Sequence, residues 1–158
     1  MIHVRLARTC DAPELKRLND LFNGTDSNSV RAIEDSLAQT NQEIVCVATK
    51  TDGASTKLIG FCCGQIVKSM CYSILYGDIT EFYLLEKYCI QNVGKQLVEL
   101  MESEFAIRSV NHLHHFVGKG NLSSQQLFRS LGYAETSESS YGSPSILIYE
   151  KDTERFTE

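Results

Sequence analysis

The sequence DITEFYLLEKYCIQNVGKQL, residues 78–97, decides the fold of this chain. Its first part, 78–85, is rich in apolar, aromatic and β-branched residues and predicts a strand. A short loop is expected over 86–91. From Asn92 to Phe105 apolar residues recur at helical spacing, which predicts the clearest helix in the chain. The stretch therefore predicts a strand, a loop and a helix in succession.

The start of that helix has the properties of an anion site. A helix begins with backbone N–H groups that lack intrahelical partners, and its dipole is positive there. Gly94 has no Cβ and lets a ligand approach the backbone. Residues 80–158 are acidic, with seven Lys and Arg against eleven Asp and Glu. We therefore expect backbone amides to hold an anion here, helped at most by Lys87 and Lys95.

The rest of the chain predicts further strands and helices on both sides of this stretch. Alternating or β-branched apolar runs predict strands, and apolar residues at helical spacing predict helices. In chain order we expect a strand over 2–6, helices over 12–22 and 29–39, a hairpin of strands over 43–49 and 58–69, a strand over 113–117, a helix over 123–131 and a strand over 146–150. This order predicts one mixed α/β domain over residues 1–151, with a frayed tail over 152–158.

Individual residues indicate where elements end or pack closely. Asp11 is expected to cap the first helix, and Asn23-Gly24 to end it. Gly132 is expected to end the last helix. Gly60 and Gly64 predict a twisted or closely packed strand.

Composition restricts the class of protein. The chain has 158 residues, is 42% hydrophobic and 22% charged, and carries a net charge of −5. These values are typical of a globular domain and exclude disorder and low-complexity arrays. An acidic balance argues against nucleic acid or an anionic membrane as partner. No window reaches the ~18 apolar residues of a membrane span, and no signal-peptide pattern begins the sequence, so a cytoplasmic location is expected.

The cysteines and histidines do not predict a metal site. No CxxC pair is present, and reduced thiols are expected at the six cysteines, Cys10, Cys46, Cys62, Cys63, Cys71 and Cys89. A zinc site of cysteines with His112, His114 and His115 is the alternative, but structural zinc sites have tighter ligand spacing. On a strand, His112 and His114 share one face and His115 lies on the other. Structural or surface histidines are therefore predicted.

At this point the sequence resembles the GNAT superfamily of N-acetyltransferases over nearly its whole length. Residues 78–97 look like the family's acidic strand, Tyr, R/Q-x-x-G-x-G/A loop and helix. GKGNLSSQQLFRSLGY, residues 118–133, looks like its Asn-containing helix ending in Leu-Gly-Tyr/Phe. Residues 1–70 match in the order of elements. The resemblance implies a central twisted, mostly antiparallel sheet flanked by about four helices.

An ungapped comparison aligns residues 89–94 with the six-residue loop signature. Cys89 then replaces the usual Arg or Gln, and Asn92 replaces the first glycine. A one-gap alternative starts the signature at Gln91, but it takes Tyr88 and residues 93–97 out of register. The resemblance implies that the pyrophosphate of acetyl-CoA, the co-substrate, is bound by Cys89, Ile90, Gln91, Asn92, Val93, Gly94 and Lys95.

The resemblance also implies contacts to the rest of acetyl-CoA. The pantetheine is expected to pair with the backbone of the strand before the loop, at Tyr83, Leu84 and Leu85. Asn121 is expected near the pantetheine or the adenosine, and Ser124 takes the place of a usual small residue. Phe128 stands where the family frequently has a tyrosine. No metal is implied.

Catalysis in such a protein needs a base for the amine and an acid for the leaving thiolate. Glu81 matches the family's carboxylate on the central strand; its other interpretation is a solvent-facing residue or an ion-pair partner. Phe128 cannot donate a proton, so the acid is Tyr133, Tyr83 or water, or the role is lost. Packing in the core is the alternative for Tyr133. Tyr72 and Tyr76 are expected to contact the acceptor or simply to pack.

The resulting prediction is a cytoplasmic N-acetyltransferase that moves the acetyl group of acetyl-CoA to a primary amine. The acceptor is a small cationic molecule, such as an aminoglycoside or a polyamine, or a peptide, and an acidic protein suits all three. A homodimer is implied by the resemblance alone. Two alternatives stay open. One is a degenerate member that binds CoA or a protein without acyl transfer, and the other is an unrelated α/β binding module.

Overall fold

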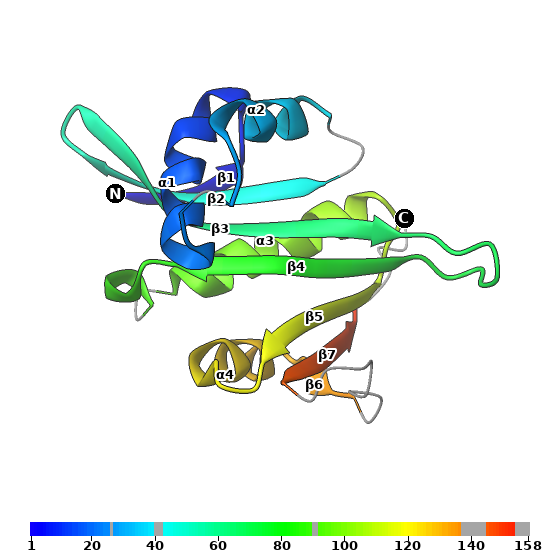
Figure 1. Cartoon of the computed structure of the whole chain (residues 1–158). Coiled ribbons are helices and arrows are strands. Elements are labelled where there is room, and N and C mark those ends of the chain that lie inside the picture. The colour runs from blue at the N-terminus through cyan, green and yellow to red at the C-terminus, as the bar shows by residue number, and fades with distance from the viewer. Residues whose placement is uncertain (26, 40–42, 90–91, 137–144, 154–158) are drawn as a thin grey trace. The chain divides into compact units, whose positions relative to one another are not determined.

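The computed structural model describes residues 1–25, 27–39, 43–89, 92–136 and 145–153. The chain forms two compact units. The first comprises Met1–Gly64 and Glu81–Met101, and the second comprises Gln65–Thr80 and Glu102–Glu158. Figure 1 labels the elements of both along the chain.

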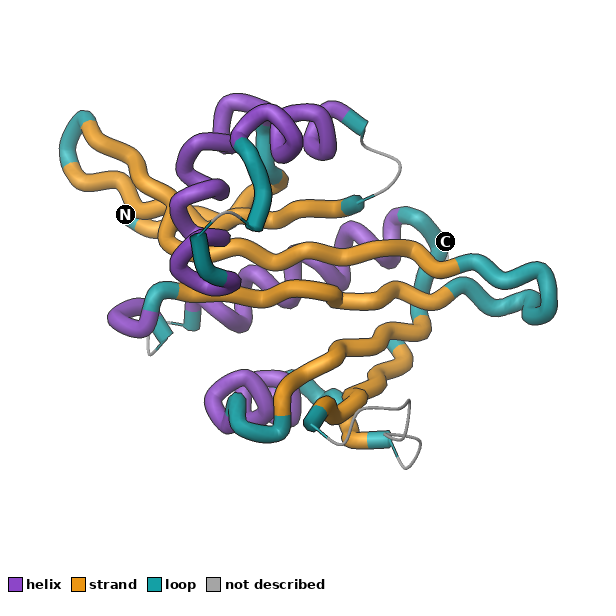
Figure 2. The backbone as a smooth tube through the Cα atoms, viewed as in Figure 1, coloured by secondary structure: helices purple, strands orange, loops and turns teal. Residues whose placement is uncertain are grey.

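The first unit contains an antiparallel set of strands at its N-terminal end. β1 (Ile2–Leu6) pairs with β2 (Ile44–Asp52), which pairs in turn with β3 (Ser55–Val67). β2 and β3 extend further toward the turn between them than the sequence predicts, because a turn of two residues is enough to join them. Gly53 occupies the left-handed region in that turn, with φ 59°. Figure 2 shows the resulting hairpin, two strands closed by a short turn.

Two helices follow β1, as predicted. α1 (Ala12–Asn23) ends at Gly24, which has φ 89°, and α2 (Val30–Ala38) begins at Ser29, whose hydroxyl accepts a hydrogen bond from the Ala32 amide. The apolar side of α1 packs on β2 and β3 because its helical spacing matches one face of the sheet. The buried cluster consists of Leu15, Leu18, Val47, Leu58 and Phe61.

The expected capping role of Asp11 is wrong. Asp11 stands at the N-cap of α1, but its side chain makes no cap hydrogen bond there. Its carboxylate instead accepts bonds from the Arg5 guanidinium at 2.7 and 2.9 Å and from the Arg8 amide at 2.7 Å. A buried carboxylate needs such charged and polar partners, and Arg5 on β1 supplies a bidentate one. The ion pair of Asp11 with Arg5 therefore links β1 to the short 3-10 helix η1 (Thr9–Asp11).

β4 (Tyr76–Leu84) enters the first unit at Glu81 and leads into the 3-10 helix η2 (Glu86–Tyr88) and α3 (Val93–Ile107). The Leu85 amide donates to the Ile59 carbonyl at 2.9 Å, which holds the end of this strand on β3. Gly60 allows that approach. A Cβ at Gly60 would lie 2.7 Å from Leu84 Cδ1 and 2.8 Å from the Tyr83 carbonyl oxygen, so the prediction of close packing there is confirmed.

The second unit is built on the parallel pairing of β4 with β5 (His112–Gly118). β5 pairs antiparallel with β7 (Ile146–Asp152), and β7 with β6 (Ala134–Glu135). α4 (Leu122–Ser130) follows β5. The sequence did not predict β6, because two exposed residues carry no apolar alternation. Gly132 has φ 90° after α4, as expected at a helix end.

The predicted fold class is confirmed. Among the described residues, seven strands form a mixed sheet in the order β1-β2-β3-β4-β5-β7-β6, with β4 and β5 parallel and the β1–β2, β2–β3, β5–β7 and β6–β7 pairs antiparallel, and there are four α-helices. Within the described part of the chain, no helix has both the length and the apolar character needed to cross a membrane. Domain limits of 1–151 stay a prediction. Of the expected tail, 152–153 are described and 154–158 lie outside the described residues.

Candidate functional site

A cavity of about 340 Å³ in the first unit is the candidate for the reaction site. Residues of α1, α2, β2, β3 and β4 line it, and both apolar and polar side chains contribute. They are Leu15, Asn19, Asn23, Ser27, Asn28, Ile33, Ser36, Leu37, Glu43, Val45, Phe61, Cys63 and Glu81. The volume suits a small molecule or the end of a longer one.

Glu81 brings the predicted carboxylate of β4 into this cavity. Its side chain is partly buried, and this burial raises the pKa of the carboxyl above its usual value. Glu43 lies on the same cavity and its charge raises the Glu81 pKa further. A carboxylate with a raised pKa is a stronger base than an exposed one, which is the property that a proton acceptor needs.

Glu43, just before β2, is a second carboxylate that the sequence analysis did not single out. The Ser36 hydroxyl donates a hydrogen bond to its Oε2 at 3.2 Å. Cys63 also lines the cavity, and burial, followed by the charge of Glu43, raises the pKa of its thiol well above the usual value. The cavity therefore holds two acidic groups and a thiol that stays protonated at neutral pH.

A hydrogen-bonded chain of side chains forms the part of the wall that α1 contributes. The Asn23 amide donates to Asn19 Oδ1 at 2.8 Å, and the Asn19 amide donates to the Ser27 hydroxyl at 2.7 Å. Asn19 and Asn23 are four residues apart and so lie on one side of the helix. These mutual bonds fix the orientation of polar groups that face the cavity.

Tyr83, a predicted pantetheine contact, packs its side chain into an aromatic group. Its ring stacks on Phe22 with centroids 5.1 Å apart and lies 5.9 Å from the ring of Phe61. Phe61 is itself part of the cavity wall. The Tyr83 ring thus packs against a residue of the cavity wall, and the backbone pairing and proton-donor role expected for Tyr83 stay predictions.

The residues predicted to contact acetyl-CoA on either side of η2 differ in burial and in hydrogen bonding. Leu84 is buried, and the Leu85 amide is already bonded to β3. The Cys89 amide donates to the Glu86 carbonyl at 3.1 Å, and burial with the charge of Glu86 raises the pKa of its thiol. Where the resemblance implies Arg or Gln, this neutral thiol supplies neither a positive charge nor an amide. Ile90 and Gln91 lie outside the described residues.

The start of α3 is the predicted anion site. Asn92 has φ 56°, a left-handed conformation that suits glycine best and asparagine next. Its carbonyl accepts from the Gln96 amide at 3.1 Å. Since α3 begins at Val93, no carbonyl of the described helix is placed to accept from the amides of Val93, Gly94 and Lys95. The Lys95 ammonium lies 3.7 Å from Glu99, which offsets part of its charge.

Three predicted cofactor positions in the second unit have structural contacts. The Asn121 side chain caps α4 by accepting from the Ser124 amide at 3.2 Å. The Ser124 hydroxyl lies 3.3 Å from His115 Nε2. Phe128 is fully buried and stacks on the His115 ring, with centroids 3.7 Å apart. Burial lowers the pKa of His115 to about 4, so this histidine is neutral.

Tyr133, the predicted proton donor, is buried and hydrogen-bonded within the second unit. Its hydroxyl donates to Glu102 Oε1 at 3.0 Å, and the same oxygen accepts from Lys151 at 2.8 Å. Its ring packs edge-on against Phe128. These contacts agree with the alternative interpretation of Tyr133 as a core residue. Its catalytic role stays a prediction.

Tyr72 and Tyr76, the predicted acceptor contacts, belong to the second unit and do not line the 340 Å³ cavity. Tyr72 is exposed, and the Tyr76 ring stacks on His114 at 4.8 Å. His115 is buried while His112 and His114 lie on the other face, so the predicted division of the histidines is confirmed. Within the described ranges, no group of His, Cys, Asp or Glu has the arrangement of a metal site.

Glu43, Ser36 and the two asparagines of α1 were not predicted from the sequence as residues of the site. Only the spacing of Asn19 and Asn23 gave a signal, because two amides four residues apart share one side of a helix. Glu43 precedes an apolar strand and looks like an ordinary solvated charge. Glu43 lies on the same cavity as Glu81 only because strands that are distant in the sequence pack together.

Comparison with protein families gives one match. A family model described as the acetyltransferase (GNAT) family matches residues 14–133. No curated protein matches the sequence.

Several solved structures share this arrangement of elements at low sequence identity. The PaiA N-acetyltransferase of Thermoplasma acidophilum, crystallised with coenzyme A, has a TM-score of 0.75 and 16% identity, covering 97% of this chain and 99% of its own. Arabidopsis thaliana NAA60 with a bisubstrate analogue has a TM-score of 0.74 and 16% identity, over 98% and 100%. The aminoglycoside acetyltransferase meta-AAC0020, from an uncultured soil metagenomic sample and in complex with sisomicin, has a TM-score of 0.67 and 16% identity, over 82% and 86%.

Proposed function

The chain belongs to the acetyltransferase (GNAT) family, and from this membership we propose that it transfers an acetyl group from acetyl-CoA to a primary amine. The acceptor is a small cationic molecule or the amino group of a peptide. The observation that carries the proposal is the position of Glu81, a partly buried carboxylate with a raised pKa in a cavity shared with Glu43.

The charge of the cavity favours a cationic acceptor. Two carboxylates face a space of about 340 Å³ in which the described lining residues include no Lys or Arg. An ammonium group would be attracted to both, and the amides and hydroxyls of α1 and α2 can bond to hydroxyl or amide groups of the same ligand. Polyamines, aminoglycosides and peptide amines all have this chemistry. Among the structural neighbours, one is bound to sisomicin and one to a bisubstrate analogue.

The start of α3 is the proposed place for the pyrophosphate. The left-handed Asn92 and the amides of Val93, Gly94 and Lys95 fit an anion there, since these donors have no partner within the helix. Acetyl-CoA supplies the acetyl group as a reactive thioester. PaiA and NatC, two of the structural neighbours, were crystallised with coenzyme A.

Glu81 has the role of general base in this proposal. A protonated amine has no free electron pair and must lose a proton before its nitrogen can bond to the acetyl carbon. Glu81 takes this proton, directly or through a water molecule, and Glu43 keeps the Glu81 pKa high enough for the transfer. The carbon–sulfur bond breaks as the carbon–nitrogen bond forms, and the leaving sulfur takes up a proton.

A second candidate function is binding of CoA without acyl transfer. The buried Phe128 favours it, because this ring has no proton to donate and lies against His115. The neutral Cys89 thiol favours it as well, since it replaces a positive or amide side chain.

One pair of measurements distinguishes the two functions. Calorimetry measures the binding of acetyl-CoA, and a thiol-release assay measures transfer to spermidine, sisomicin and a short peptide. We expect Glu81→Gln to lower kcat by roughly a hundredfold or more with little change in acetyl-CoA affinity. Glu34→Gln removes an exposed carboxylate of α2 outside the cavity and serves as the control. Binding without thiol release against any amine would support the second function, and equal turnover of Glu81→Gln and wild type would exclude Glu81 as the base.

A further inference from the structure

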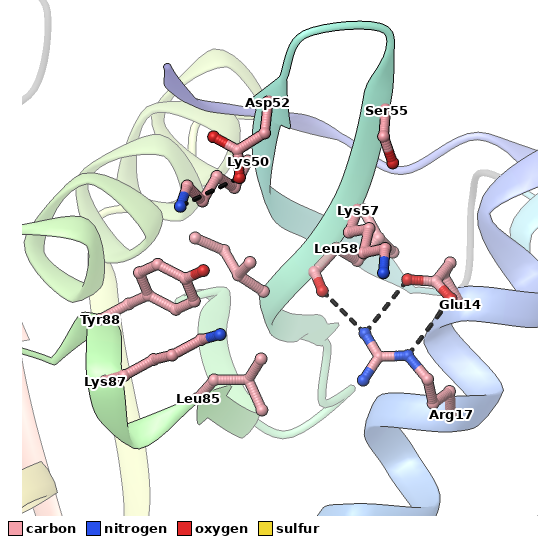
Figure 3. A pocket seen from close by; sticks show the side chains of 11 residues that line it. Glu14, Arg17, Lys50, Asp52, Ser55, Lys57, Leu58, Leu85, Lys87 and Tyr88 are labelled. Atoms are coloured by element: carbon pink, nitrogen blue, oxygen red, sulfur yellow. Dashed lines mark hydrogen bonds and ion pairs between the residues drawn. The ribbon is translucent and has the colours of Figure 1, made fainter.

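The first unit contains a second cavity, of about 570 Å³, which shares only Leu85 and Lys87 with the residues expected to contact acetyl-CoA. It is formed by α1, the β2–β3 hairpin and the segment from Leu85 to Tyr88. Figure 3 shows its lining residues, which are Glu14, Arg17, Lys50, Asp52, Ser55, Lys57, Leu58, Ile59, Leu85, Lys87 and Tyr88. None of them lines the cavity of Glu81.

The lining of this second cavity is basic in an acidic protein. Four basic side chains come from four different elements, Arg17 of α1, Lys50 of β2, Lys57 of β3 and Lys87 of η2. Only two carboxylates accompany them, so the lining carries a net charge of +2, whereas the chain carries −5. Side chains that converge from separate elements form a local positive field, unlike a row of charges on one exposed helix.

The two carboxylates are already bonded to two of the basic groups. Arg17 donates from Nε and Nη2 to the carboxylate of Glu14 at 3.2 and 3.1 Å, and from Nη2 to the Leu58 carbonyl at 2.9 Å. Lys50 lies 3.1 Å from Asp52. These bonds hold Arg17 in place and balance the charges of Arg17 and Lys50.

Lys57 and Lys87 carry the remaining positive charge. Among the residues that the structure describes, neither has a carboxylate within ion-pair distance. Figure 3 shows Lys57 beside Arg17 and Glu14, and Lys87 on the other side of the cavity beside Leu85 and Tyr88. The Lys87 ammonium lies 5.0 Å from the centre of the Tyr88 ring. An anion in the cavity would meet a positive group from each side.

The cavity also has an apolar wall. Its apolar lining residues are Leu58, Ile59, Leu85 and Tyr88; Leu85 is half-buried, and the other three expose only a few per cent of their surface. The apolar surface that a ligand can cover is therefore mainly that of Leu85, and a bare inorganic ion would leave it in contact with water. The volume lies within the range of small-molecule sites.

From these features we propose that the cavity between α1, the β2–β3 hairpin and η2 binds a small phosphorylated molecule with an apolar or ring portion. Its phosphate, close to a dianion at neutral pH, pairs with Lys57 and Lys87. Its apolar portion lies on the half-buried Leu85 and on the small exposed parts of Leu58, Ile59 and Tyr88. This site is separate from the cavity of Glu81, which has the opposite charge.

Phenyl phosphate is a suitable probe, because it joins a phosphate to a ring. Calorimetric titrations are made with the full chain saturated with CoA, so that the start of α3 is already covered. We expect phenyl phosphate to bind at least roughly fivefold more tightly than inorganic phosphate, since its ring removes apolar surface from water. Lys57→Gln is expected to raise the dissociation constant of phenyl phosphate by roughly tenfold.

Lys68→Gln is the matched control, because it removes an exposed lysine outside the cavity. It is expected to leave the binding of phenyl phosphate unchanged, and Lys57→Gln is expected to leave CoA affinity unchanged. The proposal is overturned if phenyl phosphate does not bind the CoA-saturated protein, binds no more tightly than inorganic phosphate, or binds Lys57→Gln as well as wild type. If the protein binds no CoA, the acetyltransferase proposal fails, and the same titrations without CoA still test this site.

Discussion

The charge of Glu43 raises the pKa of Glu81, and both carboxylates line one cavity although 38 positions separate them in the sequence. Burial of Glu81 is the larger cause of the shift and Glu43 the smaller. The strength of Glu81 as a base therefore depends in part on Glu43, which lies outside β4.

Glu43→Gln is expected to move the pH dependence of the reaction. The rate rises with pH as Glu81 loses its proton, and the raised pKa places this rise above the range of an ordinary carboxyl. Removing the negative charge of Glu43 lowers the Glu81 pKa, so the rise shifts to lower pH. The profile of kcat/KM against pH measures the shift. An unchanged profile would show that the two residues are not coupled.

Asn92→Gly and Asn92→Val are expected to act in opposite directions. Asn92 has φ 56°, which glycine adopts freely and a β-branched residue does not. Forcing valine into this conformation costs roughly 1–2 kcal/mol. We expect Asn92→Gly to bind acetyl-CoA at least as tightly as wild type, and Asn92→Val to bind roughly tenfold more weakly. Calorimetry measures both, and equal affinities of the two variants would contradict the geometry assigned to this loop.

Gly60→Ala is expected to destabilise the protein by about 1–3 kcal/mol. The added Cβ would meet the Tyr83 carbonyl oxygen at 2.8 Å and Leu84 Cδ1 at 2.7 Å, and a backbone oxygen cannot swing aside as the end of a side chain can. Gly118→Ala is the control, because nothing lies within 4 Å of its Cβ position. Urea denaturation compares the two free energies of unfolding, and a Gly60→Ala cost equal to that of the control would be the contrary result.

His115 is expected to make the protein less stable at low pH. Its pKa is about 4 in the folded protein, because of burial, and near 6.5 when the chain is unfolded. The unfolded state therefore binds more protons between these values, and stability falls as the pH drops from 6.5 to 4, by about 3 kcal/mol at most. His115→Asn removes this part of the decline. Unfolding free energies measured at pH 7 and pH 5 for both proteins test it.

The pKa of His114 is shifted in the opposite direction, so this histidine provides an internal comparison. Its hydrogen bond to Asp78 raises its pKa, so its contribution to stability is present below the unfolded pKa and is lost as the pH rises through the folded one. His114→Asn is therefore expected to steepen the decline on acidification. A flatter decline in this variant would count against the assignment of the two histidines.

Tyr133→Phe is expected to cost about 1 kcal/mol of stability. The substitution removes the hydrogen bond from the Tyr133 hydroxyl to Glu102 and leaves the ring against Phe128. If the hydroxyl is structural, kcat changes by less than about threefold at a temperature where the variant is folded. A loss of tenfold or more with unchanged acetyl-CoA affinity would instead give Tyr133 the proton-donor role expected from the sequence.

The order of elements was predictable because it depends on local patterns. Apolar spacing located α1 and α3, and Gly24 after α1 and Gly132 after α4 marked helix ends at residues with positive φ. β6 was not predicted, since its two residues pair with β7 without any pattern of their own. The side chain of Asp11 was misassigned because a capping residue and an ion-pair partner look alike until Arg5 is seen beside it.

The sequence by itself determined the fold class, the start of α3 and the candidacy of Glu81. Periodicity and helix ends are properties of neighbouring residues, and the resemblance rested on two continuous stretches and on the order of elements over residues 1–70. Only the tertiary structure placed Glu43 and Ser36 beside the cavity of Glu81, and Lys57 opposite Lys87 in the second cavity. The physical reason is that burial and electric field depend on which elements pack together, and side chains distant in the chain acquire their chemistry only from that packing.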